Sequence, residues 1–429
     1  MNWKKLLSEE LKQLQEEGFS VEAARGRLRK AKVRGEADAQ RLWTGYRRLP
    51  RRPDYGYREP ADHADLLRLL RTGLKIGIRP AEKDVADRLH GAWLGRAAGC
   101  MLGKPVEGWT AARIKTALVR AGTWPLSDWF TEKALGHDGK KLGVLERCLK
   151  GSIACAIRDD DMDYPILNLR ILEKYGRKFT TADVGKTWLE RMPYMLTYTA
   201  ERAAYAALAR GIKPPRTALF FNPYREWIGA QIRADLWGWV NPGSPSRAAE
   251  YAMRDAALTH VKNGMYGEMW VAATLAAALA GADVRGALKA GLAVIPESSR
   301  LAEAIRNTAW WCQTARGWEE VLASIRHTYG RYNWVHTINN ACLVVMALLC
   351  GEGDFGRTIS IAVMGGWDTD CNGATAGSIA GAVIGAKGLP ARWVAPLNDR
   401  LECGLAGEVT LSISALAKRT LELALDGKG

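Results

Sequence analysis

The chain has 429 residues, of which 48% are hydrophobic and 25% are charged, a composition typical of a folded, water-soluble protein. No run of about 18 uncharged apolar residues is present and no apolar signal core follows Met1, so neither a membrane span nor a secretory leader is predicted. The eight cysteines form no CxxC pair, which predicts free thiols in a reducing cytoplasm.

The first 80 residues predict a helical extension. Leucines at helical spacing and interleaved charges over residues 1–50 indicate charged amphipathic helices. Residues 51–57 break that pattern and are typical of a linker, and residues 62–71 predict a short helix. We therefore assign residues 1–80 to a basic helical extension and linker, and residues 81–429 to the main domain.

About half of the net charge of +15 lies in this extension, in basic runs such as residues 25–30 and 47–52. Two interpretations stay open. The charge either attracts nucleic acid or another anionic partner, or it forms a solvated helix face. Because no nucleic-acid motif accompanies the runs, we favour the solvated face and expect no nucleic-acid partner, although the charge does not exclude one.

Residues from about 85 onward have almost entirely helical periodicity. Stretches such as residues 164–175, 266–279 and 339–349 place apolar residues at helical spacing. Alternating strand patterns with hairpin turns are scarce, and no repeat of fixed length is present. The main domain is therefore predicted to be compact and all-α.

Glycine recurs at every fourth position in two separate stretches of the main domain. This spacing places the glycines on one face of a helix, where they let another backbone come close. Each glycine costs a helix about 0.8–1 kcal/mol relative to alanine, so the pattern predicts tight packing that offsets this cost. The two stripes are Gly91, Gly95, Gly99 and Gly103, and Gly373, Gly377, Gly381 and Gly385.

Asp368 and Asp370 flank Thr369 directly before the second glycine stripe. Two carboxylates with a hydroxyl between them form a compact set of hard oxygen donors. Such donors select Mg²⁺, Mn²⁺ or Ca²⁺ over softer metals. This segment predicts a divalent-cation site.

A second acidic run, Asp159-Asp160-Asp161 followed by Asp163, precedes a predicted helix. It either supplies capping charges for the helix N-terminus or binds metal. Set beside the first cluster, it favours a site with two neighbouring divalent ions, because such a site needs carboxylates from both sides.

Glu107 lies in the turn that follows the first glycine stripe, within residues 103–109. A glutamate at this position acts as a general acid or base if burial raises its pKa. The alternative, which the turn alone favours, is an exposed residue without a chemical role.

Three further polar segments are weaker signals. Residues 222–233 form a polar, aromatic loop of the kind that lines nucleotide pockets. Residues 259–267 place a histidine before a glycine-rich turn, which either presents N–H groups to an anion or caps a helix C-terminus. Residues 334–340 are explained by helix capping. The sequence has no P-loop, GxGxxG, HExxH or GxSxG motif.

Taken in order, these segments resemble the ADP-ribosylglycohydrolase family, which includes the dinitrogenase-reductase-activating glycohydrolases and J1-crystallin-like members. The resemblance covers about residues 88–400. Five family motifs are matched in order. The first is a Gly-x-Pro-x-Glu turn, and the last is a Gly-Gly-Asp-Thr-Asp segment with its small-residue helix. The matching residues are 103–107, 159–161, 229–233, 258–264 and 366–386.

The resemblance implies an all-α orthogonal bundle that carries the N-terminal helical extension. The two acidic clusters would hold a pair of Mg²⁺ or Mn²⁺ ions. The family hydrolyses the glycosidic bond at the anomeric carbon of ADP-ribose on proteins, small molecules or polymer. The metals would bind the vicinal ribose hydroxyls while a water attacks an oxocarbenium-like transition state. The expected partner is an ADP-ribosylated protein or small molecule.

The resemblance also implies roles for individual residues. Glu107 matches a position with acid–base function, and Asp161 is the second catalytic residue that we expect. The implied metal ligands are Asp159, Asp160, Asp161, Asp368, Asp370 and Cys371. The implied substrate-binding residues are Gly229, Arg233, His260, Gly264, Tyr266 and Trp367.

Three of these residues depart from the family pattern. Asp159 and Cys371 stand where the family has threonine, and a thiol is a poor ligand for Mg²⁺. Trp367 stands where a second glycine is usual, and its ring is expected to narrow the pocket. Two alternatives therefore stay open: a glycosidase for a different furanoside or nucleoside-like substrate, and a non-catalytic binding or structural protein like the crystallin-like relatives.

Overall fold

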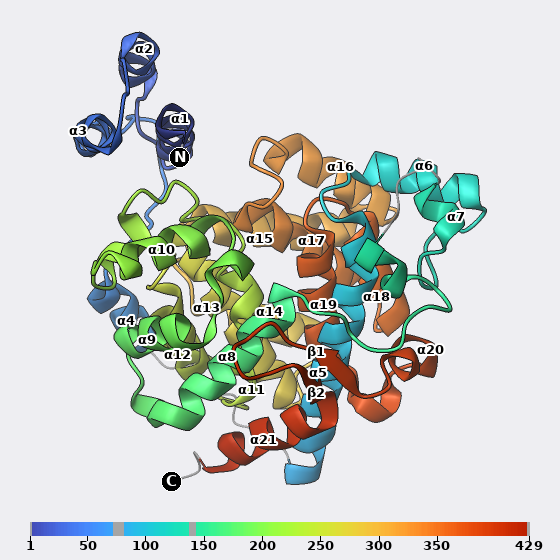
Figure 1. Cartoon of the computed structure of the whole chain (residues 1–429). Coiled ribbons are helices and arrows are strands. Elements are labelled where there is room, and N and C mark those ends of the chain that lie inside the picture. Colours follow the sequence, from blue (N-terminus) through green and yellow to red (C-terminus); the bar gives the residue numbers. More distant parts are fainter. Residues whose placement is uncertain (1, 72–80, 137–142, 427–429) are drawn as a thin grey trace.

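The computed structural model describes residues 2–71, 81–136 and 143–426. In these ranges the chain is all-α apart from one small sheet (Figure 1), which confirms the predicted fold class. The longer helices of the main body are α5 (Glu82–Gly103), α6 (Ala111–Ala121), α8 (Asp160–Tyr175), α9 (Thr181–Arg191), α10 (Thr199–Ala209), α12 (Pro245–Ala256), α13 (Lys262–Leu279), α14 (Val284–Leu292), α15 (Arg300–Thr314), α16 (Trp318–Tyr329), α17 (Thr337–Cys350), α18 (Phe355–Met364), α19 (Thr369–Ile384) and α21 (Ile413–Asp426). The shorter ones are α7 (Glu132–Leu135), α11 (Asp235–Trp239) and α20 (Ala391–Val394).

Helices α5 and α19 form the centre of the bundle and run antiparallel, side by side (Figure 1). The two glycine stripes face each other across this contact. A Cβ atom on Gly377 would lie 2.1 Å from the carbonyl oxygen of Gly95, and one on Gly373 would lie 2.3 Å from that of Gly99. The close packing expected of the stripes is therefore a contact between the two stripes themselves, and it fixes where both helices end.

The other helices surround this pair. Helix α13 is buried along almost its whole length, and α17 and α18 pack against α19. The predicted helical stretches at residues 164–175, 266–279 and 339–349 lie in α8, α13 and α17. Two short strands that the sequence did not indicate, β1 (Arg400–Glu402) and β2 (Thr410–Ser412), pair antiparallel. Of the helices that the structure describes, none is both long and apolar enough to cross a membrane.

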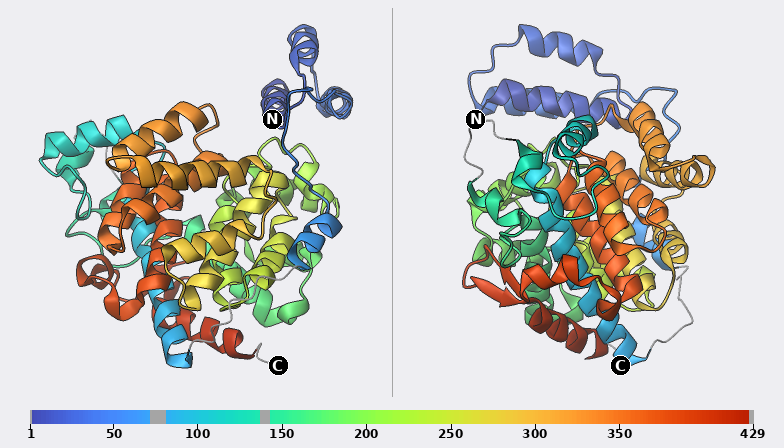
Figure 2. Two further views of the ribbon diagram at one scale, coloured as in Figure 1. Left: turned by 180° about the vertical axis from the view of Figure 1, so that it is seen from behind. Right: turned by 90° about the vertical axis from the view of Figure 1, so that its right-hand side faces the viewer.

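The N-terminal extension forms a small helical unit at one end of the molecule (Figure 2). Its helices are α1 (Trp3–Glu16), α2 (Glu22–Lys30) and α3 (Glu36–Tyr46), and α4 (His63–Arg71) follows an irregular linker, as predicted. Leucines and aromatic residues of α1 to α3 form an apolar cluster of their own, which Phe221 of the main body completes. The proposed boundary at residue 80 lies outside the described residues and stays a prediction.

Buried ion pairs join the extension to the main body. Arg225 contacts Glu10 at 2.6 Å and Glu17 at 2.7 Å, and both carboxylates are almost fully buried. Arg300 contacts Glu59 at 2.8 Å and Glu226 at 2.8 Å. The extension therefore faces the body with glutamates, although its net charge is positive.

The basic runs of the extension point to solvent. Arg27, Arg29 and Lys30 are exposed on α2, and so are the arginines of residues 47–52. Because exposed basic residues fit both a solvated surface and an anionic partner, both interpretations of the charge stay open, and the expected lack of a nucleic-acid partner stays a prediction.

Candidate metal centre

The C-terminus of α5 meets the N-terminus of α19, because the packing of the two glycine stripes sets the register of these helices. Gly103 ends α5, and its carbonyl oxygen accepts a hydrogen bond of 2.7 Å from the Thr369 hydroxyl. A Cβ atom on Gly103 would lie 2.1 Å from the Thr369 carbonyl oxygen. A side chain at residue 103 would therefore force the two helix ends apart.

Two loops pair at this junction and place Glu107 beside Asp368. The Gly108 N–H donates to the Trp367 carbonyl, and the Trp367 N–H donates to the Trp109 carbonyl, both at 2.9 Å. Trp367 adopts a left-handed backbone conformation with φ +63°, which is unfavourable for a bulky residue. Strain of this kind persists only where the surrounding contacts hold the chain in place.

The acidic run enters the junction from the sheet. Ala156 exchanges backbone hydrogen bonds with Arg400 and Glu402 of β1, which anchors the chain before Asp159. Asp159 is the N-cap of α8, and its carboxylate accepts a hydrogen bond of 2.9 Å from the Asp161 N–H. Helix capping, one of the two interpretations left open, therefore accounts for part of this run.

The structure brings both acidic clusters together. In each of three groups, the possible ligand atoms lie within 4.8 Å of one another. The first group is Glu107, Asp368 and Asp370, the second is Asp161, Asp370 and Cys371, and the third is Cys100, Asp159 and Asp161. Asp370 and Asp161 each belong to two groups, so the three groups form one continuous centre. Asp160 belongs to none of them.

Two cations lie at one side of this centre. The Lys104 ammonium pairs with the Asp159 carboxylate. Arg96, which is fully buried, contacts the Asp161 carboxylate at 3.1 Å and the Asp235 carboxylate at 2.8 Å. On the other side, Asp370 Oδ1 is buried and has no hydrogen-bond partner in the described part of the chain. Compensation of the negative charge is therefore uneven.

Most carboxyl groups of the centre resist ionisation. Asp159 is the exception, because Lys104 and the Asp161 N–H outweigh its burial and lower its pKa. Burial, together with Glu107 and Asp159, raises the pKa of Asp370 to about 8. Glu107 lies at the exposed rim, where partial desolvation and repulsion by Asp159 and Asp160 raise its pKa to about 7. Burial and the neighbouring carboxylates also raise the pKa values of Asp161 and Asp368. Crowded carboxylates of this kind require a bound cation or protons.

The group of Glu107, Asp368 and Asp370 suits a divalent cation. All its donors are hard oxygens, and the unpartnered Asp370 Oδ1 is a free ligand atom. Cys100 and Cys371 lie in the other two groups, and burial raises the pKa of both thiols well above the usual value. Protonated thiols are poor ligands for Mg²⁺ or Mn²⁺. The ligand role expected of Cys371 stays a prediction.

Arg233, His260 and Gly229 lie in a second, separate charge network. Arg233 is fully buried and contacts Asp255 at 2.7 Å and Glu201 at 3.3 Å. His260 Nδ1 lies 2.6 Å from the Thr259 hydroxyl, and burial lowers the pKa of its imidazole. A Cβ atom on Gly229 would lie 1.9 Å from the Glu201 carboxylate. The Arg233 guanidinium is occupied by internal contacts, and the substrate-binding roles of Arg233, His260 and Gly229 stay predictions.

Gly264 and Tyr266 lie on α13, where the main body meets the extension. Gly264 approaches the Arg225 carbonyl, which a Cβ atom would meet at 2.5 Å. The Tyr266 hydroxyl donates to the carbonyl of Pro60 in the linker. Trp367, by contrast, is half-buried directly beside Asp368 at the metal centre. Of the six expected substrate-binding residues, Trp367 is the one that the structure places against the acidic groups.

Three residues of the centre were missed in the sequence. Lys104 lies within the turn that was singled out, but its partner Asp159 is far away along the chain. Arg96 was detectable as a lone cation within a helix of small residues. Trp334 has an exposed fraction of 40%, and its ring lies close to Gly108. It therefore adds a second tryptophan near Trp367.

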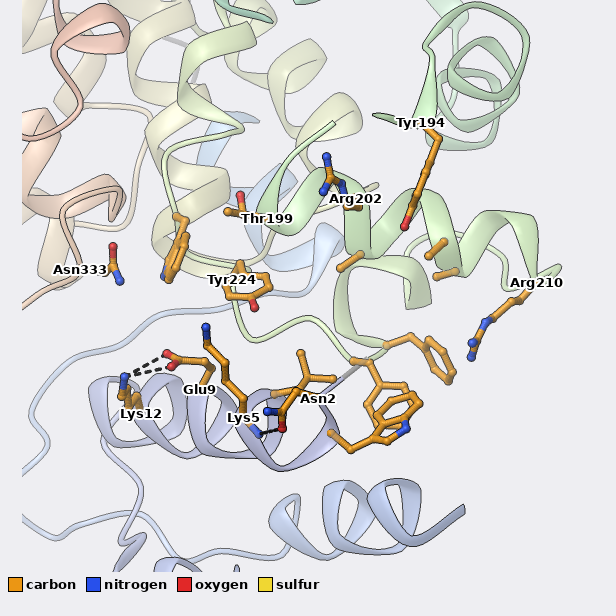
Figure 3. A pocket seen from close by; sticks show the side chains of 18 residues that line it. Asn2, Lys5, Glu9, Lys12, Tyr194, Thr199, Arg202, Arg210, Tyr224 and Asn333 are labelled. Atoms are coloured by element: carbon orange, nitrogen blue, oxygen red, sulfur yellow. Dashed lines mark hydrogen bonds and ion pairs between the residues drawn. The ribbon is translucent and has the colours of Figure 1, made fainter. Parts of the chain in front are cut away.

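A separate cleft of about 570 Å³ lies between the extension and α10 (Figure 3). Its walls include Trp3 and Lys5 of α1, Arg202 of α10, and Tyr224 and Trp227 of the loop that follows. None of the residues expected at the active site lines this cleft. It is a feature of the docked extension.

Comparison with known proteins identifies the family. Residues 81–426 match the family model of the ADP-ribosylglycohydrolases. A solved structure described as an "ADP-ribosylglycohydrolase-related protein complex" shares the fold, with a TM-score of 0.52 and 22% sequence identity over 80% of this chain and 99% of that chain. No curated protein matches the sequence. The chain therefore belongs to the ADP-ribosylglycohydrolase family and is a hydrolase of glycosidic bonds.

Proposed function

We propose that the protein is a divalent-metal-dependent hydrolase that cleaves the glycosidic bond of an ADP-ribosyl group on a protein or small molecule. The observation that carries the proposal is the buried carboxylate of Asp370, whose Oδ1 has no partner among the described residues although Glu107 and Asp368 crowd it. A divalent ion satisfies these oxygens and removes their mutual repulsion. The family membership supports the reaction class.

Mg²⁺ or Mn²⁺ is the ion that this set of donors fits. We propose Asp160, Asp161, Asp368 and Asp370 as the ligand set inherited from the family, with Asp159 and Thr369 as supporting residues. Glu107 lies beside Asp368 and Asp370 at the rim and is left for the proton chemistry. A bound ion would polarise the ribose hydroxyls beside the anomeric carbon and hold the sugar in place.

Glu107 is the proposed proton carrier. Its pKa of about 7 leaves the group partly protonated near neutral pH, so it can lose or gain a proton. During hydrolysis the bond between the anomeric carbon and the leaving group breaks, and water supplies the new oxygen. One proton of the water stays on the new anomeric hydroxyl, and the other passes through Glu107 to the leaving group, so that Glu107 is returned to its starting state. Asp161 is held by Arg96, and we propose that it orients the sugar and the water rather than exchanging protons.

Trp367 and Trp334 form the proposed aromatic wall of the sugar site. Trp367 is the neighbour of Asp368, and the Trp334 ring lies close to Gly108, so both rings would offer stacking surfaces to a sugar. Because Trp367 narrows the entrance relative to a glycine, a furanoside or nucleoside-like substrate other than ADP-ribose is the second candidate. The cytoplasm is the proposed location, since all eight cysteines are free.

The test is hydrolysis of ADP-ribosyl-arginine and ADP-ribosyl-serine peptides by the full chain after removal of metal, with Mg²⁺ or Mn²⁺ added back. We expect ADP-ribose release that depends on the ion. The second candidate is supported if the chain binds the ion, releases no ADP-ribose and shows no change in melting temperature in millimolar ADP-ribose. If the chain binds no divalent ion in calorimetry, both hydrolase candidates are contradicted. The chain is then a binding or structural protein.

A further inference from the structure

Both carboxylate oxygens of Asp159 already accept a hydrogen bond, and the charge of the group is compensated by Lys104. Its Oδ1 accepts the hydrogen bond from the Asp161 N–H at 2.9 Å, and its Oδ2 receives the Lys104 ammonium. Lys104 is placed by the helix pair, because it directly follows Gly103, where the end of α5 lies close to Thr369 of α19. Its side chain has an exposed fraction of only 17%, so the ammonium is largely enclosed.

The donor chemistry also differs between the two sides of the centre. On the Lys104 side, the group of Asp159, Asp161 and Cys100 contains one buried thiol, and Arg96 already binds Asp161. On the Glu107 side, the donors are three carboxylates, and Asp370, with an exposed fraction of 5%, has an unpartnered oxygen. Only the second side combines hard donors, excess negative charge and a free ligand atom.

We propose that this chain holds a single divalent ion, bound by Asp368 and Asp370 beside Glu107, and that the Lys104 ammonium takes the place of a second ion. The proposal deepens the proposed function and rests on it, since it requires that the centre binds metal. A lysine ammonium is a compact point charge with three N–H donors. It neutralises Asp159 without any need for open coordination positions.

This substitution has a consequence for the substrate. A divalent ion both binds a hydroxyl oxygen and favours its deprotonation, whereas an ammonium binds the oxygen only as a hydrogen-bond donor. On the Lys104 side the site can therefore orient a sugar hydroxyl but cannot activate it. Any hydroxyl or water that must lose a proton is expected on the side of Glu107, Asp368 and Asp370.

Calorimetric titration of the metal-stripped full chain with Mn²⁺ tests the proposal. We expect one ion per chain in the wild type. Two ions per chain would overturn the single-ion inference and leave the proposed function intact. No bound ion would contradict the metal dependence of the proposed function, and the inference with it.

Variants at the Lys104 pair identify the cause. In Lys104→Met the Asp159 carboxylate loses its ammonium partner, and we expect this variant to bind two Mn²⁺ ions per chain. Lys104→Arg keeps the positive charge, and we expect it to bind one Mn²⁺ ion per chain. Asp159→Asn is expected to keep one ion with less than about a tenfold change in affinity, because Asp159 is not a ligand. Loss of the ion in folded Asp159→Asn protein, or one ion in folded Lys104→Met protein, would overturn the role of Lys104.

Discussion

Two clusters of buried carboxylates in this molecule have opposite character. Where the extension docks, Glu59 and Glu226 both contact Arg300, which outweighs the effect of burial and lowers both pKa values to about 2. At the candidate metal centre, neither Asp370 nor Glu107 forms an ion pair with an arginine or lysine of the described residues, and their pKa values rise to about 8 and about 7. Burial is common to both regions, so the difference lies in the partner cation.

The comparison separates structural carboxylates from functional ones. A carboxylate paired with an arginine has its charge compensated and does not need a bound cation. An unpaired one costs stability, and proteins retain such groups mainly where a ligand compensates them. The extension interface is of the first kind, and the group of Glu107, Asp368 and Asp370 is of the second.

The largest expected effect is on activity. Asp370→Asn and Asp368→Asn each remove a charged ligand, and we expect kcat/KM to fall by about 1000-fold or more, because the ion supplies several kcal/mol of transition-state stabilisation. Steady-state hydrolysis at saturating Mn²⁺ measures this loss. Activity within tenfold of the wild type would place the metal elsewhere.

The paired cluster is expected to respond in stability. Arg300→Met leaves Glu59 and Glu226 buried without their cation, which should lower the free energy of unfolding by about 3–5 kcal/mol. Urea denaturation followed by circular dichroism measures the change. Arg316→Met is the control, because this arginine is solvent-exposed, and its midpoint should match that of the wild type. Equal midpoints for both variants would refute the structural role of the paired cluster.

The glycine contact that positions the metal centre is open to a smaller perturbation. In Gly377→Ala the new Cβ atom would lie 2.1 Å from the Gly95 carbonyl oxygen, and we expect a loss of about 1–3 kcal/mol in stability. Gly26→Ala on α2 is the matched control, since nothing lies within 4 Å of its Cβ position. The control should be neutral or stabilising by up to about 1 kcal/mol. A neutral Gly377→Ala would contradict the close contact of α5 and α19.

The metal-induced stabilisation should depend on pH. In the metal-free folded state the pKa of Asp370 is raised to about 8, above the ordinary value of 3.8, so protons compete with the ion. Below the raised pKa, the ion must displace a proton from Asp370, so the Mn²⁺ affinity rises by about tenfold for each pH unit and each displaced proton. Above the raised pKa, this competition is lost. The Mn²⁺-induced increase in melting temperature should therefore be larger at about pH 8 than at about pH 6. An increase that is independent of pH would contradict the raised pKa.

Local patterns in the sequence predicted the helices and both acidic clusters, because helical spacing and carboxylate runs need only nearby residues. The spacing of the glycines likewise predicted a close contact, but not that the two stripes contact each other. The pairs that decide the chemistry, Lys104 with Asp159 and Arg96 with Asp161, are tertiary. No spacing rule connects residues so far apart.

The extension illustrates the same limit. The sequence showed basic runs, and the structure exposes them on the surface, which both interpretations of the charge require. The face of α1 that contacts the body instead carries buried glutamates, Glu10 and Glu17, which pair with Arg225. Net charge describes the exposed side of the extension, whereas docking depends on the few residues of the opposite face.

The most direct test of the contrast between the clusters is the Mn²⁺ affinity of three metal-stripped proteins: the wild type, Asp370→Asn and folded Glu226→Gln. Both variants replace one buried carboxylate by an amide of nearly the same shape. The account predicts that Asp370→Asn weakens Mn²⁺ binding by about 100-fold or more, while Glu226→Gln binds the ion as the wild type does. Wild-type affinity in Asp370→Asn would contradict the assignment of the unpaired cluster as the metal centre.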